Sequence, residues 1–556
     1  MEKIWLKHYP ADVPAEIEKT NETLVDFLED ACKKYPNNRA FTSHGETLTF
    51  KKSHTYINNL AASLTKLGVQ KGDRVAVILP NLSQYPISIF AILKIGAIVV
   101  NINPLYTENE MGYILQDSGA KVAIVLNMIA KNLNNLYGKN NLQHIIVTKV
   151  PDLYPFIKRA IMNFVIKYIK RTNTDYLYKA HSFKDMVLKE SNLNLKNEVI
   201  SSDIAFLQYT GATTGRPKGA MLLHSNIVAN ILQIRLWIKP WAPDLDKQIV
   251  IDALPLYHIF SLTANLFTFF FAGSENIMIP NPRDVQSTIE VLKKFPFTIF
   301  SALDTLYNHL LNSPEFTRNK YPYFKYSVAG GMVARESVAN RWFKETNVMP
   351  SNCYGLTETS PAVTMNPFDN TFDNSVGFPI PSTEVEIRDQ ENGSLLPINS
   401  IGLIFVKGPQ VMKGYWNNPE KTAHVLDKDG WFNTGDCGYL NEFGKLFISG
   451  RQNDMIIVSG FNVYPVEVEQ VLDKIPEVKE AVVVGSIYEP TGERVNAFVV
   501  LKPNMSITES EIIKKCKKDL ANYKIPHRIF IINELPKTLV GKIDKKRLSD
   551  KLKELS

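Results

Sequence analysis

Short, mostly apolar segments alternate with helix-like segments over the first 370 or so residues, and this alternation limits the folds open to the chain. VAVILP (75–80), AIVVNINP (97–104), KVAIVL (121–126) and HIIVTK (144–149) are apolar at most positions. Helical patterns such as SQYPISIFAILKIG (83–96) separate them. Strands that are apolar on both faces occur in parallel sheets covered by helices on each side. The sequence therefore predicts an α/β fold with parallel sheets.

The length of the chain and changes in its pattern of strands and turns predict several domains. A chain of 556 residues exceeds a single hydrophobic core. The alternating pattern predicts two α/β units, about 20–200 and 201–370. Shorter strands with crowded turn signals predict a small β-rich subdomain at about 374–447. With a joint at Arg451–Asp454, we expect an N-terminal domain over 1–451 and a separate α+β C-terminal domain over 452–556.

Composition and charge constrain the class of protein. An apolar fraction of 45% and a charged fraction of 21% fit a globular protein. The net charge of +7 permits an acidic substrate or an anionic membrane surface and requires neither, and we expect no nucleic-acid partner. The four cysteines are far apart, which argues against a clustered zinc site and for a reducing compartment. The N-terminus lacks the apolar core of a signal peptide.

Two apolar segments require a membrane test. Residues 253–274 carry no formal charge, but Pro255, His258 and several hydroxyl and amide side chains interrupt them, so a buried helix is predicted. Residues 154–171 place apolar side chains at helical spacing, with five basic residues and no acidic one. Such a helix can lie on an anionic membrane or pack on its own domain, and the sequence leaves both open.

The most distinctive motif is the glycine-rich segment YTGATTGRPKG, from Tyr209 to Gly219. Its glycines let backbone N–H groups turn toward an anion, its threonines add hydroxyl donors, and Lys218 supplies a compact positive charge. The segment follows a predicted strand and precedes a predicted helix that starts at His224, a common setting for phosphate. The spacing is not that of a Walker A loop, and a flexible surface linker is the alternative.

Three later motifs carry further chemistry. YGLTET (354–359) brings together an aromatic ring able to stack on a purine, the Thr357 hydroxyl, and the Glu358 carboxylate, which can hold Mg²⁺. Asp436 ends GWFNTGD and can accept hydrogen bonds from both ribose hydroxyls. Lys542 follows a glycine in PKTLVGKIDKKRL, where a loop can carry one lysine into a cleft. Taken singly, the motifs are also compatible with a surface glutamate, a plain β-turn and a solvated lysine-rich tail.

In this order and on these elements, the four motifs resemble those of the adenylate-forming superfamily, which includes acyl-CoA synthetases, luciferases and adenylation domains of peptide synthetases. The resemblance runs almost end to end. Segments such as PNLSQYPISIFAILKIGAIVVNINPLYT, ALPLYHIFSLT, GPQVMKGYW and SGFNVYPVEVE are most similar to bacterial long-chain fatty acid–CoA ligases. The resemblance implies a large N-terminal domain followed by a small, mobile C-terminal domain.

The resemblance implies an ATP-dependent ligase that works in two steps. A fatty acid carboxylate attacks the α-phosphate of ATP to give an acyl-adenylate and pyrophosphate, and the CoA thiolate then displaces AMP. Mg²⁺ is the implied cofactor, with Thr210 and Glu358 as its contacts, and ATP and CoA are co-substrates. The implied catalytic residues are His258, Thr357, Glu358 and Lys542. ATP binding is implied for Thr210, Gly211, Ala212, Thr213, Thr214, Gly215, Lys218, Gly330, Gly331, Tyr354, Gly355, Asp436 and Arg451.

The resemblance also implies movement and location. In the second step the C-terminal domain swings about a hinge at Asn453 and carries Lys542 away. Ser459, Gly460, Phe461 and Asn462 then line the CoA channel. The fatty acid would occupy an apolar tunnel walled by the helix at 259–271 and the strand at 297–302. A cytoplasmic location with peripheral contact to the inner membrane surface, and a homodimer, are expected as well.

Three positions depart from the superfamily pattern. Ala212 and Cys353 stand where glycine is usual, and Asn453 stands where a charged residue is usual, but no catalytic group is lost. Two alternative functions remain. A fatty acyl-AMP ligase would pass the acyl group to a carrier protein, although the insertion such proteins carry before the hinge is not seen. A catalytically silent lipid-binding scaffold is disfavoured by the presence of Lys542 and Glu358.

Overall fold

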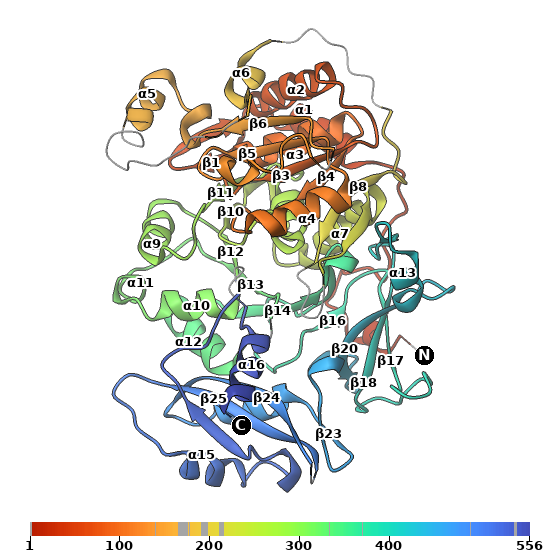
Figure 1. The fold of residues 1–556 in the computed structure, drawn as a ribbon, viewed down its shortest axis with the longest axis vertical. Helices are drawn as coiled ribbons and strands as arrows, with labels where there is room; N and C mark the ends of the chain where they lie inside the picture. Colours follow the sequence, from red (N-terminus) through yellow and green to blue (C-terminus); the bar gives the residue numbers. More distant parts are fainter. Residues whose placement is uncertain are drawn as a thin grey trace.

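The computed structural model describes residues 3–139, 141–164, 176, 178–190, 198–210, 216–332, 334–369, 371–489, 491–538 and 542–555. Figure 1 shows a large N-terminal region built on two extensive sheets, a smaller sheet at its side, and a separate C-terminal domain in blue. The α/β class predicted from the alternating pattern is confirmed.

The first large sheet has eight strands. Their order is β19 (Gly414–Tyr415), β9 (Gly219–Leu223), β8 (Ile204–Tyr209), β4 (Ile98–Asn101), β3 (Arg74–Ile78), β5 (Val122–Leu126), β6 (His144–Thr148) and β7 (His181–Ser182). All neighbours from β8 to β7 run parallel, whereas β9 runs antiparallel to both β8 and β19. Strands β4 and β5 are buried at every position, as parallel strands between two helical layers should be.

The second large sheet has nine strands. Their order is β16 (Phe378–Pro379), β15 (Ala362–Met365), β14 (Pro350–Gly355), β13 (Tyr326–Ala329), β12 (Ile299–Ala302), β10 (Ile249–Asp252), β11 (Glu275–Met278), β1 (Arg39–Ser43) and β2 (Glu46–Thr49). The strands from β14 to β1 are parallel, and antiparallel strands close both edges.

The two sheets exchange strands across the boundary that the sequence pattern suggested. Strands β8 and β9 follow residue 201 but belong to the first sheet, and β1 and β2 precede it but belong to the second. The expected division into units at 20–200 and 201–370 therefore does not separate the sheets. Periodicity shows that a segment is a strand, but strand partners are chosen by long-range packing that no local pattern encodes.

Some helices of the N-terminal region begin at capping residues. The helices of this region are α1 (Leu24–Lys34), α2 (Phe50–Lys66), α3 (Gln84–Lys94), α4 (Glu108–Ser118), α5 (Phe156–Phe164), α6 (Phe183–Leu188), α7 (His224–Ile238), α8 (Thr268–Phe270), α9 (Val285–Lys294), α10 (Asp304–Leu311), α11 (Pro314–Arg318), α12 (Glu336–Thr346) and α13 (Pro419–Val425). Thr23 and Asp26 form a capping box at the start of α1, and Thr107 and Glu110 form another at α4. Gly119 ends α4 with a φ of 62°.

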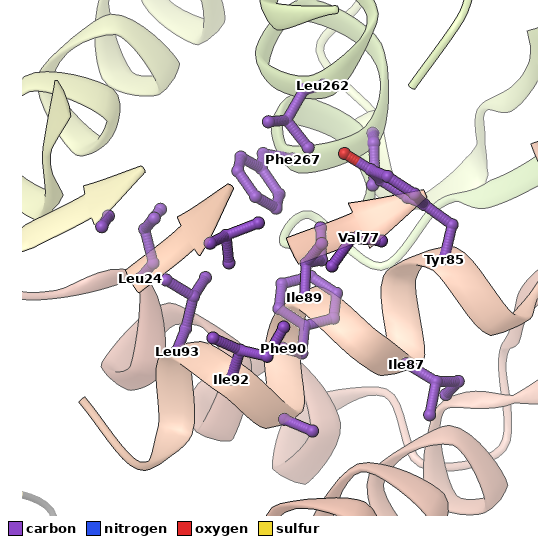
Figure 2. Packing of buried hydrophobic residues seen from close by; sticks show 14 of the residues in the cluster. Leu24, Val77, Tyr85, Ile87, Ile89, Phe90, Ile92, Leu93, Leu262 and Phe267 are labelled. Atoms are coloured by element: carbon purple, nitrogen blue, oxygen red, sulfur yellow. The ribbon is translucent and has the colours of Figure 1, made fainter. Parts of the chain in front are cut away.

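The uncharged run at 253–274 forms a buried π-helix, Phe260–Phe267, that continues into α8. Figure 2 shows Leu262 and Phe267 facing Phe90 and Leu93 of α3. Each of these side chains has at most 1% of its surface exposed, and burial of a side chain of this size contributes about 1.5–3 kcal/mol. The buried helix predicted here is confirmed, and no helix in the described ranges is long and apolar enough to cross a membrane.

Two smaller sheets complete the fold. The predicted β-rich segment forms a four-stranded antiparallel sheet of β17 (Glu384–Arg388), β18 (Gly402–Lys407), β20 (Phe432–Leu440) and β21 (Leu446–Arg451). The C-terminal domain contains β22 (Ile456–Val458), β23 (Phe461–Val463), β24 (Val478–Tyr488), β25 (Gly492–Leu501) and β26 (Arg528–Ile531), with α14 (Pro465–Asp473), α15 (Glu509–Cys516) and α16 (Lys545–Leu555). A 3₁₀ turn, Gln452–Asp454, joins the two sheets at the residues expected to form the hinge.

The C-terminal domain lies below α10 and α12 of the N-terminal region (Figure 1). Ser337 Oγ donates to Asp473 Oδ1 at 2.9 Å, and Asn308 Nδ2 donates to Glu480 Oε1 at 3.3 Å. Arg335 Nη1 also donates to the Lys479 carbonyl oxygen at 2.6 Å. These contacts join α14 and β24 of the C-terminal domain to the α10 and α12 region.

Candidate active site

One large cavity of about 2490 Å³ lies between the C-terminal domain and the carboxyl ends of the parallel strands. Ligands bind at this edge in open α/β sheets because loops and polar side chains gather there. Side chains from all four predicted motifs line the cavity, including Lys218, Tyr354, Asp436 and Lys542. Motifs separated by more than 300 residues in the sequence are therefore brought together at one place.

The glycine-rich segment lies between two strands that pair antiparallel. Strand β8 ends at Tyr209 and β9 begins at Gly219, and Thr210 N donates to the Lys218 carbonyl oxygen at 3.0 Å. The helix predicted to follow the loop directly is instead preceded by β9, so the loop is not at a helix N-terminus. Thr210, Arg216 and Lys218 line the cavity. The predicted contacts Gly211, Ala212, Thr213, Thr214 and Gly215 lie outside the described residues.

Tyr354, Asp436 and Arg451 form a hydrogen-bonded group on one wall. The Tyr354 hydroxyl donates to Asp436 Oδ2 at 2.6 Å, and Arg451 Nε lies 2.7 Å from Asp436 Oδ1. Asp436 and Arg451 are directly paired across β20 and β21, so the sheet register sets their ion pair. Burial raises the pKa of Asp436, although the Arg451 guanidinium and the Tyr354 hydroxyl oppose this. Asp436 is thus a buried acceptor close to an aromatic ring, as ribose recognition requires.

Glu358 and Lys218 meet through Tyr415, a residue that motif analysis did not single out. The Tyr415 hydroxyl donates to Glu358 Oε1 at 2.7 Å, and Lys218 Nζ lies 4.8 Å from the centre of the Tyr415 ring. Gly414 and Tyr415 form β19, which pairs with β9 beside the glycine-rich segment. The signal in the sequence was GPQVMKGYW, which contains Tyr415 but has no charged or nucleophilic group beyond a lysine.

Two glycines after β13 allow close packing at the other wall. A Cβ atom at Gly330 would lie 2.6 Å from Cys353 Sγ, and one at Gly331 would lie 2.9 Å from Leu303 Cδ2. Gly331 also has a φ of 78°, which favours glycine. Cys353, where glycine is usual, therefore fills the space opposite Gly330 and lines the cavity. Gly355, the last residue of β14, and Thr357, two residues beyond it, also line the cavity.

Lys542 and His258 approach the cavity from opposite sides. Burial lowers the pKa of Lys542, Arg451 lowers it further, and Asp436 acts in the opposite direction. Burial lowers the pKa of His258 to about 3, with a contribution from the positive charge of Lys542. His258 Nδ1 accepts a hydrogen bond from the Phe260 N–H at 3.3 Å. His258 is therefore neutral near pH 7, and Lys542 lines the cavity where the two domains meet.

One part of the cavity wall is mostly apolar, and we call this part the apolar branch. Its walls include Ile234 and Ile238 of α7, Phe260, Ala264 and Phe269 of the π-helix and α8, Ile299 of β12, Val328 of β13 and Met365 of β15. The helix at 259–271 and the strand at 297–302, expected to wall an acyl tunnel, both contribute. The branch can accommodate an extended apolar chain whose polar end lies near His258 and Lys542.

The residues predicted to bind CoA lie elsewhere. Ser459 and Gly460 form the turn between β22 and β23, with φ values of 51° and 80°, and Ser459 N donates to the Thr491 carbonyl oxygen. The Phe461 ring stacks on Tyr523 at 4.8 Å and is 56% exposed. Asn462 is also exposed. This structure therefore brings Lys542 to the cavity and leaves the turn away from it, whereas the hinge residue Asn453 lines the cavity wall.

A preformed metal cage is not part of the site. Among the residues that the structure describes, no three His, Cys, Asp or Glu side chains are grouped to hold an ion. Glu358 and Thr210 supply one carboxylate and one hydroxyl to the same cavity. Mg²⁺ typically keeps several waters and takes one or two carboxylates plus substrate phosphates, so this sparse donor set fits an ion that arrives with a nucleotide.

Comparison with known proteins agrees with this geometry. Residues 28–416 match the model of the AMP-binding enzyme family, and residues 467–542 match that of the AMP-binding enzyme C-terminal domain. The long-chain-fatty-acid–CoA ligase of Yersinia pestis is 44% identical, with 99% of this chain and 98% of that protein covered. The ligase of the same name from Bacillus subtilis is 38% identical, with 98% of each covered.

Solved structures agree in fold over the whole chain. ATP-bound MatB from Rhodopseudomonas palustris superposes with a TM-score of 0.85 at 27% identity, covering 96% of this chain and 100% of that one. The anthranilate CoA ligase AuaEII in complex with anthranoyl-AMP gives a TM-score of 0.85 at 26% identity, covering 97% and 98%. The motifs, the cavity they share and the matches over nearly the full length lead to one conclusion: the chain belongs to the AMP-binding enzyme family.

Proposed function

We propose that the chain is an AMP-forming long-chain fatty acid–CoA ligase that uses ATP and CoA as co-substrates. The observation that carries the proposal is the meeting of Lys542 with Asp436, Glu358 and His258 at the mouth of an apolar branch. The similarity to long-chain-fatty-acid–CoA ligases at 38–44% identity over nearly the whole chain supports the choice of substrate.

In the first step, a fatty acid carboxylate oxygen attacks the α-phosphorus of ATP. The bond from the α-phosphorus to the bridging oxygen breaks, and pyrophosphate leaves with its electron pair. Lys542 stabilises the negative charge that develops on the carboxylate and α-phosphate oxygens. His258, which is neutral, orients the carboxylate by hydrogen bonding and forms no ion pair with it. Tyr354 stacks on adenine between Gly355 and the Gly330–Gly331 pair, while Asp436, held by Arg451, accepts from the ribose hydroxyls.

The β- and γ-phosphates lie along the glycine-rich segment, with Thr210 and Lys218 at its two ends. Thr210 and Glu358 would hold Mg²⁺, which would supply positive charge against the departing pyrophosphate. Thr357 donates to a phosphate oxygen. Tyr415 keeps the Glu358 carboxylate turned into the cavity through its 2.7 Å hydrogen bond.

In the second step the CoA thiolate attacks the acyl carbonyl carbon and AMP leaves with its carboxylate-derived oxygen. The C-terminal domain rotates about Asn453, which removes Lys542 and brings the 459–462 turn to the cavity. The exposed position of this turn in the present arrangement supports such a rotation, since the turn has no contact with the cavity it is expected to serve. The domains move as 1–451 and 452–556.

Pyrophosphate release from ATP and palmitate, measured with and without CoA, tests the proposal. A CoA ligase turns over repeatedly only with CoA and forms palmitoyl-CoA. A fatty acyl-AMP ligase releases about one equivalent of pyrophosphate and forms no CoA thioester. A silent lipid-binding scaffold releases none in either condition.

Contact with an anionic membrane through α5 is part of the proposal. No residue of α5 is buried, and Phe156, Ile157 and Ile161 are 75%, 73% and 57% exposed. An amphipathic helix with its apolar side chains in solvent is typical of an interfacial helix and argues against the packed alternative. Lys158 forms an ion pair with Glu46, so it attaches the helix to the domain instead of pointing freely to a surface. Residues 165–171 of the predicted helix lie outside the residues that the structure describes.

Two further expectations stay predictions. Peripheral association places the protein on the cytoplasmic side of the inner membrane, which fractionation of cells tests. A homodimer is tested by light scattering of the purified protein.

A further inference from the structure

The apolar branch of the cavity contains one polar position. Asn265 of the π-helix and Ser301 of β12 line the branch, and each is only 1% exposed. Ser301 Oγ donates to Asn265 Oδ1 at 2.9 Å. This bond leaves the oxygen of Ser301 able to accept. The Asn265 amide lies beside Asp252, and because Nδ2 carries two hydrogens, one remains able to donate to a further group. Methylene groups neither donate nor accept hydrogen bonds, so a plain acyl chain would leave this polar pair without a partner in the substrate.

The pair lies where a larger group of buried polar side chains borders the cavity. Val250 of β10 is level with Ile299 of β12 and with Asn276 of β11, so Asp252, Asn276 and Ser301 lie on the same face of the sheet. The Asn265 amide lies beside the Asp252 carboxylate, whereas both polar atoms of Asn276 and Thr263 Oγ1 on the covering helix lack hydrogen-bond partners. Each of these side chains is fully buried.

An unpaired buried polar group reduces stability, and a group of them adjacent to a binding cavity indicates a missing polar partner. Burial raises the pKa of Asp252 well above its usual value, more than the neighbouring Asn265 amide lowers it. The Asn265 and Asn276 amides and the Ser301 and Thr263 hydroxyls together offer both donors and acceptors. A group that both donates and accepts is the matching partner.

We propose that this position selects fatty acids that carry a hydroxyl group along the acyl chain, with the hydroxyl held by Ser301 and Asn265. The inference rests on the proposed function, since it assigns the substrate class of the same acyl branch. A hydroxyl donates to Ser301 Oγ and accepts from Asn265 Nδ2, which completes the polar group. Asn265 lies within the π-helix that begins two residues after His258, so the hydroxyl is on the chain and not beside the carboxylate.

The test compares palmitic acid with palmitic acids hydroxylated at one carbon at a time, in an acyl-CoA formation assay with ATP and CoA. We expect kcat/KM to peak at one hydroxyl position, about tenfold above acids hydroxylated elsewhere. In Ser301→Ala and Asn265→Leu, the ratio of kcat/KM for the preferred hydroxy acid to that for palmitate should fall about tenfold. Asn265→Leu keeps the side-chain volume, so a loss of ratio there reports the lost amide.

Ser327→Ala is the matched control. Ser327 is a buried serine on the neighbouring β13 that faces the other side of the sheet, where its Oγ lies 2.8 Å from the Tyr307 hydroxyl. The control should leave the ratio unchanged. A parent that uses palmitate but shows no preferred hydroxyl position, or a ratio that both variants preserve, would overturn the inference and leave only buried water as the partner. Absence of thioester from every acid would instead overturn the proposed function.

Discussion

Arg335 Nη1 donates to the backbone carbonyl of Lys479 at 2.6 Å, and this hydrogen bond joins the N-terminal region to the C-terminal domain. The same guanidinium is held by Asp304, whose carboxylate lies 2.7 Å from Arg335 Nη2 and 2.8 Å from Nε. The buried carboxylate thus fixes the arginine, and the arginine fixes the domain orientation that brings Lys542 to the cavity.

Replacement of Arg335 should therefore shift the balance between the two half-reactions. A hydrogen bond from a charged group contributes about 1.5–3 kcal/mol, so Arg335→Gln should weaken the present domain orientation about tenfold or more. Adenylate formation from palmitate and ATP should slow, and thioester formation from supplied acyl-adenylate and CoA should not. Arg341→Gln, which loses a 2.9 Å bond to Asn312 within one domain, is the control. Equal slowing of both half-reactions would exclude a role in domain orientation.

Lys542→Ala should separate the half-reactions more sharply. Removal of one electrostatic contact to a transition state typically costs a factor of about 10²–10³. Pyrophosphate release should fall by that factor, while the conversion of supplied acyl-adenylate to acyl-CoA should be nearly intact. Lys551→Ala, on the exposed side of α16, should affect neither rate. A matching loss in both rates would contradict the assignment of Lys542 to the first step alone.

Tyr415→Phe tests the residue that orients Glu358. The variant removes only the hydroxyl that donates to Glu358 Oε1 and keeps the ring beneath Lys218. We expect adenylate formation to slow about tenfold, with a larger Mg²⁺ requirement for half-maximal rate, because the carboxylate is no longer held toward the cavity. Tyr439→Phe, whose ring stacks on Phe447 in the β-rich sheet, should have no effect. An unchanged Mg²⁺ requirement in Tyr415→Phe would remove Tyr415 from the site.

The double variant Ile157→Gln with Ile161→Gln should release the protein from vesicles. Burial of an apolar side chain of this size contributes about 1.5–3 kcal/mol, so loss of two should reduce partition into anionic vesicles at least a hundredfold. The thermal midpoint should not change, because both side chains are already exposed. Ile487→Gln, at an 86% exposed position of the C-terminal domain, is the control for general surface hydrophobicity. Undiminished sedimentation of the double variant with vesicles would assign α5 no membrane role.

Acid should destabilise the N-terminal region partly through His224. Burial lowers the pKa of His224 to about 4 from an ordinary value of 6.5, and His224 Nδ1 accepts a hydrogen bond from the Leu24 N–H at 3.2 Å. Between pH 6.5 and 4, His224 therefore binds a proton in the unfolded chain but stays neutral in the folded one. The stability is fully present above pH 6.5 and is lost as pH falls toward 4.

The loss attributable to this residue should be about 2 kcal/mol at pH 5. His224→Asn, which retains an acceptor for Leu24, should show a smaller decrease in thermal midpoint between pH 7 and pH 5 than the parent. His527→Asn, at an exposed position, should behave as the parent does. Identical pH profiles of the parent and His224→Asn would remove His224 from the acid response.

The chain's local patterns were sufficient for the class of fold and for most of its chemistry. Apolar runs such as 75–80 and 121–126 became buried parallel strands, because only a strand covered on both faces can use apolar side chains on both. Asp436 and Lys542 were singled out because their motifs together resemble those of the adenylate-forming superfamily, and both side chains line the cavity. These properties depend on neighbours in the sequence.

Tertiary structure alone decided which of these residues meet. The strand β9, the exchange of β1 and β8 between sheets, and the contact of Tyr415 with Glu358 all depend on pairings between segments far apart in the chain. The polar pair of Asn265 and Ser301 in an apolar branch likewise appears only when a helix crosses a strand. Periodicity records whether a side chain is buried, but the partner of a buried side chain is set by how sheets and helices pack, and that information is spread over the whole sequence.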